Sequence, residues 1–429
     1  MKTILTAKLK LHTTSETGQR LLDTAGAYRK ALNYTSQVAF EHGKLSNQVK
    51  LHGLVYPALR ARFALPSQLA CSVSRQVGAT YKALWTKVKH NAVHRQRGYT
   101  PKRYKGLDQA PVFTSNTTTF TYQRDYRFKS GQRVSLTTLD GPVIVAYDGY
   151  AKHRDLIQKG ASGGVTFGAA KLWRDPRTHR FYLLVSVEVD TPDPTPESLK
   201  GIKGADLGER YLAVTTTPGN KTQFFRGGAI RHKGEAFQRV RSRLQSKGTR
   251  GAQKRLRQWQ LRERRFKADV NHRIAKAIVE PGFLIGLEDL SRIRERTNVR
   301  GRQNRRRRAK WAFAELGAFI AYKAQLAGGL AIRVDADYTS KGCPRCGHVD
   351  ETNRPHKGLR FCCTACGFTL HADLVGARNV TLRTLLIRQD WMGTGLLSTA
   401  PDGSDDETKA KRLHRFLELR WNPDPSSAL

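Results

Sequence analysis

The spacing of apolar residues changes several times along the chain, and each change predicts a different kind of element. Apolar and basic side chains alternate over Met1–Leu11, which predicts a strand. From about Ser15 the apolar residues recur at helical spacing, and the same pattern returns over Ser67–Lys89. We therefore expect a helical segment that runs from Ser15 to about His94.

Residues 112–191 carry short apolar runs that are rich in Val, Thr and Tyr and are separated by Gly, Asp and Pro. Such runs predict short strands, and several short strands with turn signals between them predict a small barrel. We expect the strand at the start of the chain to join this barrel, so that the helical segment is an insertion within it. The stretch Thr191–Glu197 is rich in proline and predicts a linker.

Beyond the linker, strand and helix patterns alternate, which is typical of an α/β domain. The expected strands lie on both sides of Asp206 within Gly201–Thr217, and at Phe283–Leu287 and Ala331–Val334. The expected helices are Glu235–Val279, broken near Lys247–Gly251, then Trp311–Leu326 and Leu374–Ile387. The segment from Thr394 onward is rich in Gly, Ser and Asp and becomes helical over Asp406–Leu419.

Charge narrows the class of partner. The chain has 76 Lys and Arg against 35 Asp and Glu, a net charge of +41 over 429 residues. A surface with this excess repels itself, and a nucleic acid is the usual partner that relieves such repulsion. The basic stretches Arg239–Arg273 and Arg292–Arg308 are candidates for phosphate contacts, although a charge run is also typical of a solvated helix face. A ribosomal or simply soluble basic protein is the other interpretation, and the apolar content of 39% disfavours it.

Neither a signal peptide nor an apolar run of membrane-spanning length is found, so we expect an intracellular protein without a membrane partner. Five of the six cysteines fall between Cys343 and Cys366. In a reducing compartment such clustering indicates metal binding and not disulfides.

Two C-x-x-C pairs predict a zinc ribbon. Two intervening residues let one turn of backbone present both thiolates to the same tetrahedral ion. Cys362, His348 and His356 are weaker alternative ligands. Ribbons of this kind usually stabilise a fold and do no chemistry, so we expect a structural zinc ion. The predicted ligands are Cys343, Cys346, Cys363 and Cys366.

Three acidic residues stand at the ends of predicted elements. Asp206 and Glu288 each follow a buried strand pattern, and Asp373 begins the helix pattern Leu374–Ile387. Carboxylates on elements that converge would hold Mg²⁺ or Mn²⁺ and would suit two-metal phosphodiester chemistry. Each residue taken singly would more often be a helix cap or an ion-pair partner.

Polar residues Gln68, Ser72 and Gln76 recur every four positions along one predicted helix. A polar stripe on a rigid element can contact base edges of DNA. The ordinary alternative is the exposed side of an amphipathic helix.

Five motifs, in this order, make the chain resemble the transposon-encoded TnpB (OrfB) nucleases, which are relatives of the compact type V CRISPR effectors. The resemblance extends from about Gly201 to Leu386. The motifs are GADLG at Gly204–Gly208, LEDL at Leu287–Leu290, YKAQLAG at Tyr322–Gly328, YTSKGCPRCG at Tyr338–Gly347 and FCCTACGFTLHADLVGARNV at Phe361–Val380.

The resemblance implies an α/β plus β fold, in which a RuvC-like (ribonuclease-H-like) domain carries an inserted zinc ribbon and follows a wedge β-barrel with a helical recognition insertion. The implied domains are 1–14 and 106–197 for the barrel, 15–105 for the recognition domain, 198–338 and 368–393 for the nuclease domain, 339–367 for the ribbon and 394–429 for a C-terminal tail.

The activity implied by the resemblance is RNA-guided DNA cleavage, with Asp206, Glu288 and Asp373 as metal-binding catalytic acids. The implied cofactors are Mg²⁺ (or Mn²⁺) and Zn²⁺, and the implied partners are a guide RNA and a target double-stranded DNA. Such a protein would work in the bacterial or archaeal cytoplasm, at the nucleoid when active. Arg378 follows the last acid as the family expects and is a further candidate for contacting nucleic acid.

One motif departs from the family pattern. The family usually has Asn and Ala two and three residues after the last Asp, whereas this chain has Val375 and Gly376. The Asp itself is kept, so we expect activity to survive. Two other functions stay open: an RNA-guided DNA-binding protein that cuts weakly or not at all, and a strand-transferring transposase. The intact acid trio disfavours the first, and the late ribbon insertion disfavours the second.

Overall fold

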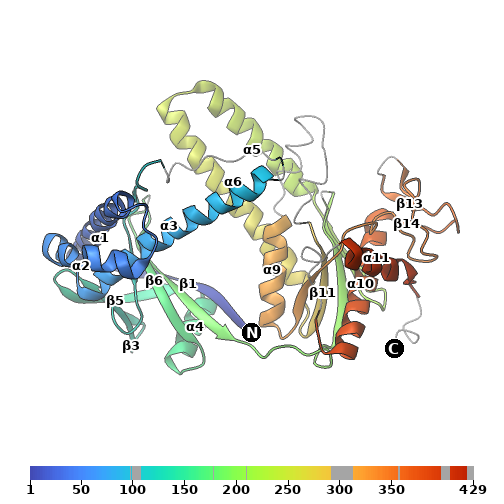
Figure 1. Cartoon of the computed structure of the whole chain (residues 1–429), viewed down its shortest axis with the longest axis horizontal. Coiled ribbons are helices and arrows are strands. Elements are labelled where there is room, and N and C mark those ends of the chain that lie inside the picture. The colour runs from blue at the N-terminus through green and yellow to red at the C-terminus, as the bar shows by residue number, and fades with distance from the viewer. Residues whose placement is uncertain are drawn as a thin grey trace. The chain divides into compact units, whose positions relative to one another are not determined.

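The computed structural model describes residues 1–96, 98, 108–176, 178–208, 210–290, 313–355, 358–397 and 406–422. They form two compact units, one of Lys2–Asp190 and one of Thr191–Leu429 together with Met1 (Figure 1). The division coincides with the start of the predicted Pro-rich linker. In the parts of the chain described, no helix is long and apolar enough to span a bilayer.

Three helices make up the helical part of the N-terminal unit: α1 (Ser15–Glu41), α2 (Gln48–Phe63) and α3 (Ser67–Gln96). Thr14 caps α1 through a reciprocal capping box with Thr17, and the side chain of Asn47 caps α2. The predicted helical segment is thus confirmed.

A seven-stranded sheet forms the rest of the unit, in the order β2-β6-β7-β1-β5-β4-β3. Its first and last strands approach each other, because Tyr122, just after β2, bridges to Tyr126 of β3, whose hydroxyl donates to the carbonyl of Gly168 on β6 at 2.7 Å. The sheet is therefore nearly closed, and the first strand joins it as predicted. The strands are β1 (Lys2–His12), β2 (Thr117–Phe120), β3 (Tyr126–Lys129), β4 (Arg133–Thr138), β5 (Gly141–Gly149), β6 (Thr166–Arg174) and β7 (Phe181–Asp190).

Two elements of this unit were not predicted from the sequence. Helix α4 (Ala151–Ala161) follows β5 within the region expected to hold strands only. It buries a single residue, Ile157, so it lacks the apolar stripe by which a helix is recognised. Strand β3 has only four residues, too few to show an alternating pattern.

The C-terminal unit is built on a five-stranded mixed sheet in the order β10-β9-β8-β11-β12. Strands β8, β11 and β12 are parallel to one another, whereas β9 and β10 run antiparallel to their neighbours. Strand β10 was not predicted. The strands are β8 (Gly201–Asp206), β9 (Tyr211–Thr216), β10 (Gln223–Arg226), β11 (Phe283–Glu288) and β12 (Leu330–Val334).

Helices cover both faces of this sheet. Helix α10 (Ala372–Thr394) packs on one face with Ile202 and Leu284, and α6 (Arg250–Ile278) and α9 (Phe313–Leu326) pack on the other with Ala205 and Ile285. Successive side chains of a strand point to opposite faces of the sheet. Because helices cover both faces, the side chains on both are apolar, which explains the continuous apolar runs in the sequence.

Two further parts extend from the sheet. Helix α5 (Gly228–Lys247) pairs with α6 as a helical hairpin (Figure 1), and the predicted break is real: Gly248 ends α5 in a left-handed conformation, and the Thr249 side chain caps α6. Short strands β13 (Arg360–Cys362) and β14 (Thr369–His371) form a separate two-stranded sheet just before α10. Helix α11 (Asp406–Glu418) follows α10 and contacts it.

Candidate functional site

The strand register brings Asp206 and Glu288 side by side. Strands β8 and β11 are parallel, and Leu287 lies opposite Ala205, so the next residue of each strand is the carboxylate. Each is also an even number of positions from a residue of the α10 face: Ile202 on β8 and Leu284 on β11. Both carboxyls therefore lie at the carboxyl ends of neighbouring strands and on the face covered by α10.

Helix α10 brings the third acid to the same place. Asp373 is in its first turn, and its backbone N–H is directed to His371, the N-cap residue. Two glycines bring the helix close to the strands. A Cβ at Gly204 would lie 2.7 Å from the carbonyl oxygen of Ala377, and one at Gly376 would lie 3.0 Å from Oδ2 of Asp206. The residues that depart from the family pattern thus include the one that touches Asp206.

The three carboxyls interact electrostatically. Burial raises the pKa of Asp206 well above 3.8, and the charges of Glu288 and Asp373 raise it further. Burial also raises the pKa of Glu288, while the Thr339 hydroxyl, which donates to it at 2.5 Å, and the guanidinium of Arg383 oppose that rise. The cluster therefore resists holding all its negative charge unless a cation lies beside it.

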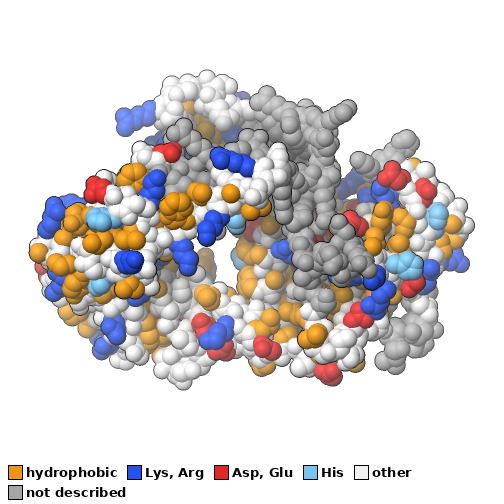
Figure 2. All heavy atoms as spheres, in the orientation of Figure 1, with side chains coloured by type: hydrophobic (Ala, Val, Ile, Leu, Met, Phe, Trp, Pro, Cys, Tyr) orange, Lys and Arg blue, Asp and Glu red, His pale blue; other side chains and the backbone are white. Residues whose placement is uncertain are grey.

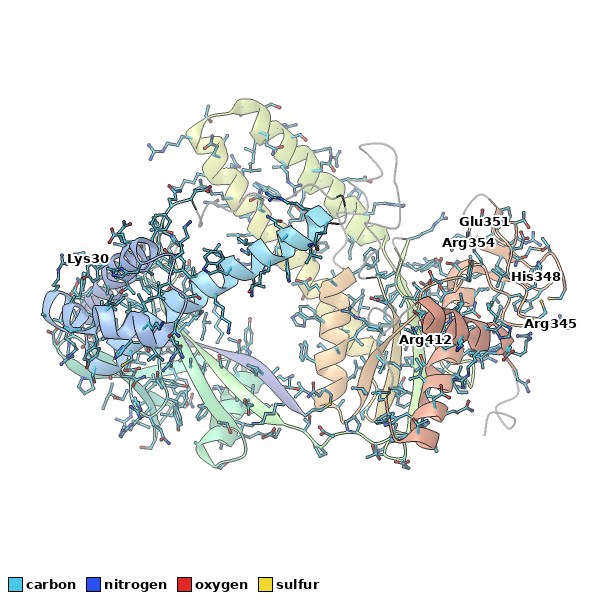
Figure 3. The ribbon with its side chains drawn as sticks, viewed as in Figure 1. Lys30, Arg345, His348, Glu351, Arg354 and Arg412 are labelled. Carbon is cyan, nitrogen blue, oxygen red and sulfur yellow. The ribbon has the colours of Figure 1, made fainter. Side chains whose placement is uncertain are left out.

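Arg354 supplies positive charge to this cluster. It belongs to the four-cysteine segment, residues 343–371. Its Nη2 lies 3.2 Å from Oδ1 of Asp373, its Nε donates to the carbonyl of Gly358, and its charge lowers the pKa of both Asp206 and Glu288. Figure 3 labels Arg354 beside Glu351, with Arg345 and His348 farther out in the same segment. Sequence reasoning missed Arg354, because one arginine among so many carries no signal of its own.

The three side chains have the chemistry of divalent-cation ligands, although among the described residues only the four cysteines lie close enough together to form a complete metal-binding group. Three carboxyls from separate elements offer oxygen ligands, which Mg²⁺ and Mn²⁺ prefer. Burial raises the pKa of Asp206 and Glu288, repulsion by Glu288 and Asp373 raises that of Asp206 further, and Arg354 offsets these rises only in part. A divalent cation would relieve both the burial cost and the repulsion.

The four predicted zinc ligands come together. Their sulfur atoms all lie within 4.8 Å of one another, with 3.7 Å between Cys343 and Cys366 and 3.5 Å between Cys346 and Cys363. A tetrahedral ion with bonds of about 2.3 Å to sulfur requires sulfur atoms about 3.8 Å apart, so the donor set fits Zn²⁺. The predicted four-cysteine cluster is confirmed.

The two pairs use the same backbone turn. The N–H of Gly347 donates to the carbonyl of Cys343, and that of Gly367 donates to Cys363, both at 2.9 Å. Each glycine has positive φ, +80° and +68°, a conformation that glycine adopts at little cost. The cluster does not include Cys362 or His348, and His356 lies outside the described residues.

The predicted DNA-reading stripe on α3 lies against strand β2 and the turn after it. Gln68 donates to the hydroxyl of Thr121 at 3.2 Å, and Gln76 accepts from Tyr28 and Thr119, each at 3.2 Å. Ser72 is buried between them, 3% exposed. The three are therefore on one face, as predicted, but that face is directed at the barrel; their role in reading DNA stays a prediction.

Arg378 is likewise engaged within the protein. Its Nη2 donates to Oδ1 of Asn220 at 3.1 Å, and its guanidinium lies over the ring of Trp421, 5.0 Å from the centroid. Burial lowers its pKa. Trp421 follows α11, so the C-terminal segment covers this arginine, and its contact with nucleic acid stays a prediction.

The helical hairpin α5–α6 carries the first predicted basic stretch, Arg239–Arg273. Beyond its base it buries little, and it is held by Phe237 against Trp259, with rings 5.4 Å apart, and by an ion pair of Arg241 with Glu263. On the face that Figure 2 shows, the described Lys and Arg side chains are spread out instead of gathered in one patch. The second stretch, Arg292–Arg308, lies outside the described residues.

Comparison with known proteins adds the identity of relatives. Residues 313–380 match the family model of the Cas12f1-like TNB domain. The chain is 30% identical over 257 residues to the CRISPR-associated endodeoxyribonuclease Cas12f1 of Sulfoacidibacillus thermotolerans, covering 56% of this chain and 58% of that protein. It is 29% identical over 197 residues to a TnpB-like protein of Methanocaldococcus jannaschii, covering 43% of this chain and 69% of the relative.

One solved structure shares the fold over most of the chain. The mini-RNA-guided endonuclease CRISPR-Cas_phi3 superposes with a TM-score of 0.51, covering 93% of this chain and 94% of that one, at 10% identity. The resemblance to TnpB proteins and compact CRISPR effectors predicted from the motifs is confirmed by these matches. The chain nevertheless spans only 58% of the length of the Cas12f1 relative.

Proposed function

We propose that this chain, which resembles TnpB-like and Cas12f1 proteins, is an RNA-guided DNA endonuclease that hydrolyses phosphodiester bonds with the help of divalent cations. The observation that carries the proposal is the convergence of Asp206, Glu288 and Asp373 on the α10 face of one sheet. The register of β8 with β11 and the packing of α10 bring together three acids that are distant in sequence. Their cluster is electrostatically unfavourable without cations.

The topology supports a RuvC-like assignment for the C-terminal unit. The sheet order β10-β9-β8-β11-β12, with three antiparallel strands followed by two parallel ones, is typical of ribonuclease-H-like nucleases. The four-cysteine segment precedes the helix that carries the last acid, as in the relatives that the motifs resemble. The domain ranges 1–14 with 106–197, 15–105, 198–338 with 368–393, 339–367 and 394–429 follow from this assignment.

The residues would divide the work as follows. Asp206, Glu288 and Asp373 would hold Mg²⁺ or Mn²⁺, which would supply Lewis acidity and an activated water. Thr339, by donating to Glu288, fixes the orientation of that carboxyl. Arg354 lies close enough to the acids to contact a phosphate brought to them. The zinc cluster would hold the segment that carries Arg354 in place.

Guide RNA and target double-stranded DNA are the partners that we propose. In RNA-guided recognition, base pairing reads the sequence while the protein contacts backbone and one short flanking motif. The net charge of +41 and the exposed basic hairpin α5–α6 support extensive phosphate contacts. Gln68, Ser72 and Gln76 remain candidates for the flanking motif, and Arg378 for the strand near the acids.

A second candidate is an RNA-guided DNA-binding protein that cuts weakly. The specific observation in its favour is the ion pair between Arg354 and Asp373, which occupies one of the three carboxyls. Guide-dependent binding without cutting in Mg²⁺ would favour this alternative.

The test is to express the chain with its flanking genomic DNA and to sequence the RNA that copurifies. The complex is then incubated with a plasmid library of randomised flanking sequence in Mg²⁺. We expect one class of bound RNA and cleavage next to one flanking motif. Asp206→Ala should keep the RNA and lose cleavage, while Asp155→Ala, at an exposed position on α4, should keep both. Absence of bound RNA would contradict both candidates.

A further inference from the structure

Three aromatic rings meet at the edge of the sheet beside the carboxylates. Tyr211 on β9, Phe224 on β10 and His371 at the start of α10 contact one another edge to face, with centroid distances of 5.1–5.2 Å. Phe224 is 40% exposed on the edge strand β10, so its ring is open to a ligand. We call this group the aromatic triad.

The strand register fixes the distance between the triad and the acids. Asp206 lies opposite Val214 on β9, and Val214 lies opposite Phe224 on β10. Opposed residues of antiparallel strands project from the same face, so Glu288, Asp206, Val214 and Phe224 form one row across four strands. Phe224 is thus two strand spacings from Asp206, about 10 Å, on the α10 face.

Two arginines flank the triad. Arg226 lies opposite Tyr211 in the β9–β10 ladder, and Arg360 lies opposite His371 in the β13–β14 ladder. Both are exposed, and neither forms an ion pair with the part of the chain that the structure describes. Guanidinium groups interleaved with rings are the composition of surfaces that bind single-stranded nucleic acid.

His371 offers an independent sign of a missing partner. Its Nδ1 accepts from the backbone N–H of Asp373 at 3.3 Å, so the proton of a neutral ring is on Nε2. This Nε2 is inaccessible to solvent and has no hydrogen-bond partner within the described protein. A buried donor without an acceptor is costly, and a phosphate or base oxygen could supply one once the rings of Tyr211 and Phe224 move aside.

We propose that the aromatic triad is a stacking subsite for an unpaired base of the DNA strand, one that holds the neighbouring phosphodiester at Asp206, Glu288 and Asp373. The inference rests on the proposed nuclease function and names a positioning element for it. Phe224 and Tyr211 stack on the base, while Arg226 and Arg360 contact the flanking phosphates. Since every base has a π-face, the subsite tolerates any sequence, as a guided nuclease requires.

The first measurement does not depend on cleavage. Single-stranded oligodeoxynucleotides with one 2-aminopurine are mixed with the full-length protein–RNA complex in Ca²⁺, and quenching of the fluorophore reports stacking. We expect quenching with the wild type and with Asp206→Ala. Phe224→Ala should lose it and bind about 5- to 150-fold more weakly, the factor that one base–aromatic stack contributes. Tyr150→Ala, at a ring 77% exposed in the other unit, is the matched control and should behave as the wild type.

The second measurement locates the base in the reaction. Targets with one abasic nucleotide are cut in Mg²⁺ under single-turnover conditions, and one position near the cut should slow the wild type but not Phe224→Ala. Phe224→Tyr should restore the sensitivity, which a purely structural role would not. If Phe224→Ala and the wild type quench the fluorophore equally, the proposed stacking subsite is wrong even if the protein cleaves DNA. Quenching that depends on Phe224 without any cleavage leaves the subsite standing and overturns the nuclease function.

Discussion

At the residue scale, glycine decides how closely the sheet and α10 approach each other. Gly204 on β8 faces the backbone of the helix, where a Cβ would meet Thr381 and lie 2.7 Å from the carbonyl oxygen of Ala377. Gly286 on the neighbouring strand faces Thr384 and Val380 in the same way. The close approach places the start of α10 beside the two strand carboxylates.

Gly204→Ala should therefore destabilise the protein by about 1–3 kcal/mol, the usual cost of overpacking a core, because backbone atoms cannot give way as a flexible side chain does. Urea unfolding of the C-terminal unit would measure it. Gly234→Ala is the matched control: this glycine lies inside α5 with open space around it, and alanine should stabilise the helix by about 0.5–1 kcal/mol. Equal effects at the two positions would contradict the packing argument.

The carboxyl cluster makes stability depend on pH. The pKa of Asp206 is raised in the folded protein above the 3.8 of the unfolded chain. Below about pH 3.8 both states are protonated and the group costs nothing; as pH rises toward the folded pKa, only the unfolded state ionises, and folding loses stability. Without divalent cations, Asp206→Asn should thus melt higher than the wild type at pH 7, by about 2–4 °C for each kcal/mol of burial cost and repulsion that the substitution removes.

The difference in melting temperature should shrink as the pH falls toward 4, and Mg²⁺ should raise the melting temperature of the wild type more than that of Asp206→Asn. Glu288→Gln should act in the same direction, because the pKa of Glu288 is raised too. Differential scanning fluorimetry across pH, with EDTA and with Mg²⁺, gives the comparison. A wild type that melts higher than Asp206→Asn in EDTA at pH 7 would show that the cluster is not repulsive.

The sequence indicated the three acids because each ends or begins an element, a local property. Their meeting depends on the register of β8 with β11, which strand patterns do not specify when both faces are buried. Arg354 and the aromatic triad could not be predicted for the same reason: their partners come from other strands and from the helix cap.

At the element scale, the four-cysteine segment is the part whose structure depends most on a ligand. It holds two short strands of three residues each, and its small core around Phe361 is completed by Val375 of α10. Such a segment folds on binding zinc. Because Arg354 belongs to it, its folding also decides whether Asp373 has a cationic partner.

Cys346→Ser should lower the zinc content from about one ion per chain and should unprotect the amides of 343–371. Strand β8, held by packing on both faces, should keep its protection in hydrogen exchange. Cys362→Ser is the matched control, since Cys362 is not in the sulfur cluster and should leave the zinc content unchanged. Loss of zinc in Cys362→Ser would mean that the ligand set is wrong.

Elements with a strong apolar period were the ones that the sequence predicted well. Helices α1, α3 and α6 and strands β7, β8 and β11 lie where their patterns indicated. Helix α4, with one buried residue, and strands β3 and β10, with four residues each, have too few core contacts to leave a pattern. These elements form because they pack or pair with other parts of the fold, and not because their own sequences favour a helix or a strand.

At the scale of the whole molecule, the net charge of +41 predicts a polyanionic partner but does not say which surface it would contact. The hairpin α5–α6 offers a way to decide, because its basic residues fall into two groups. Arg241 and Lys267 both pair with Glu263 within the hairpin. Arg250, Lys254 and Arg257 are exposed along α6, without an ion-pair partner among the described residues.

Replacing Arg250, Lys254 and Arg257 together by Ala should weaken binding of the copurifying RNA and lower the slope of log Kd against log salt by about 2–3, since each phosphate contact contributes about 0.7–0.9. Arg241→Ala with Lys267→Ala should change the slope less, because both side chains are held by Glu263, whose carboxylate offsets one of their two charges. Titrations at several KCl concentrations measure both. Loss of positive charge would lower the affinity of either variant, so affinity alone does not separate them. The slope of log Kd against log salt reports the number of phosphate contacts. If the two variants changed the slope equally, the RNA would be held by the field of the whole protein and not by this helix.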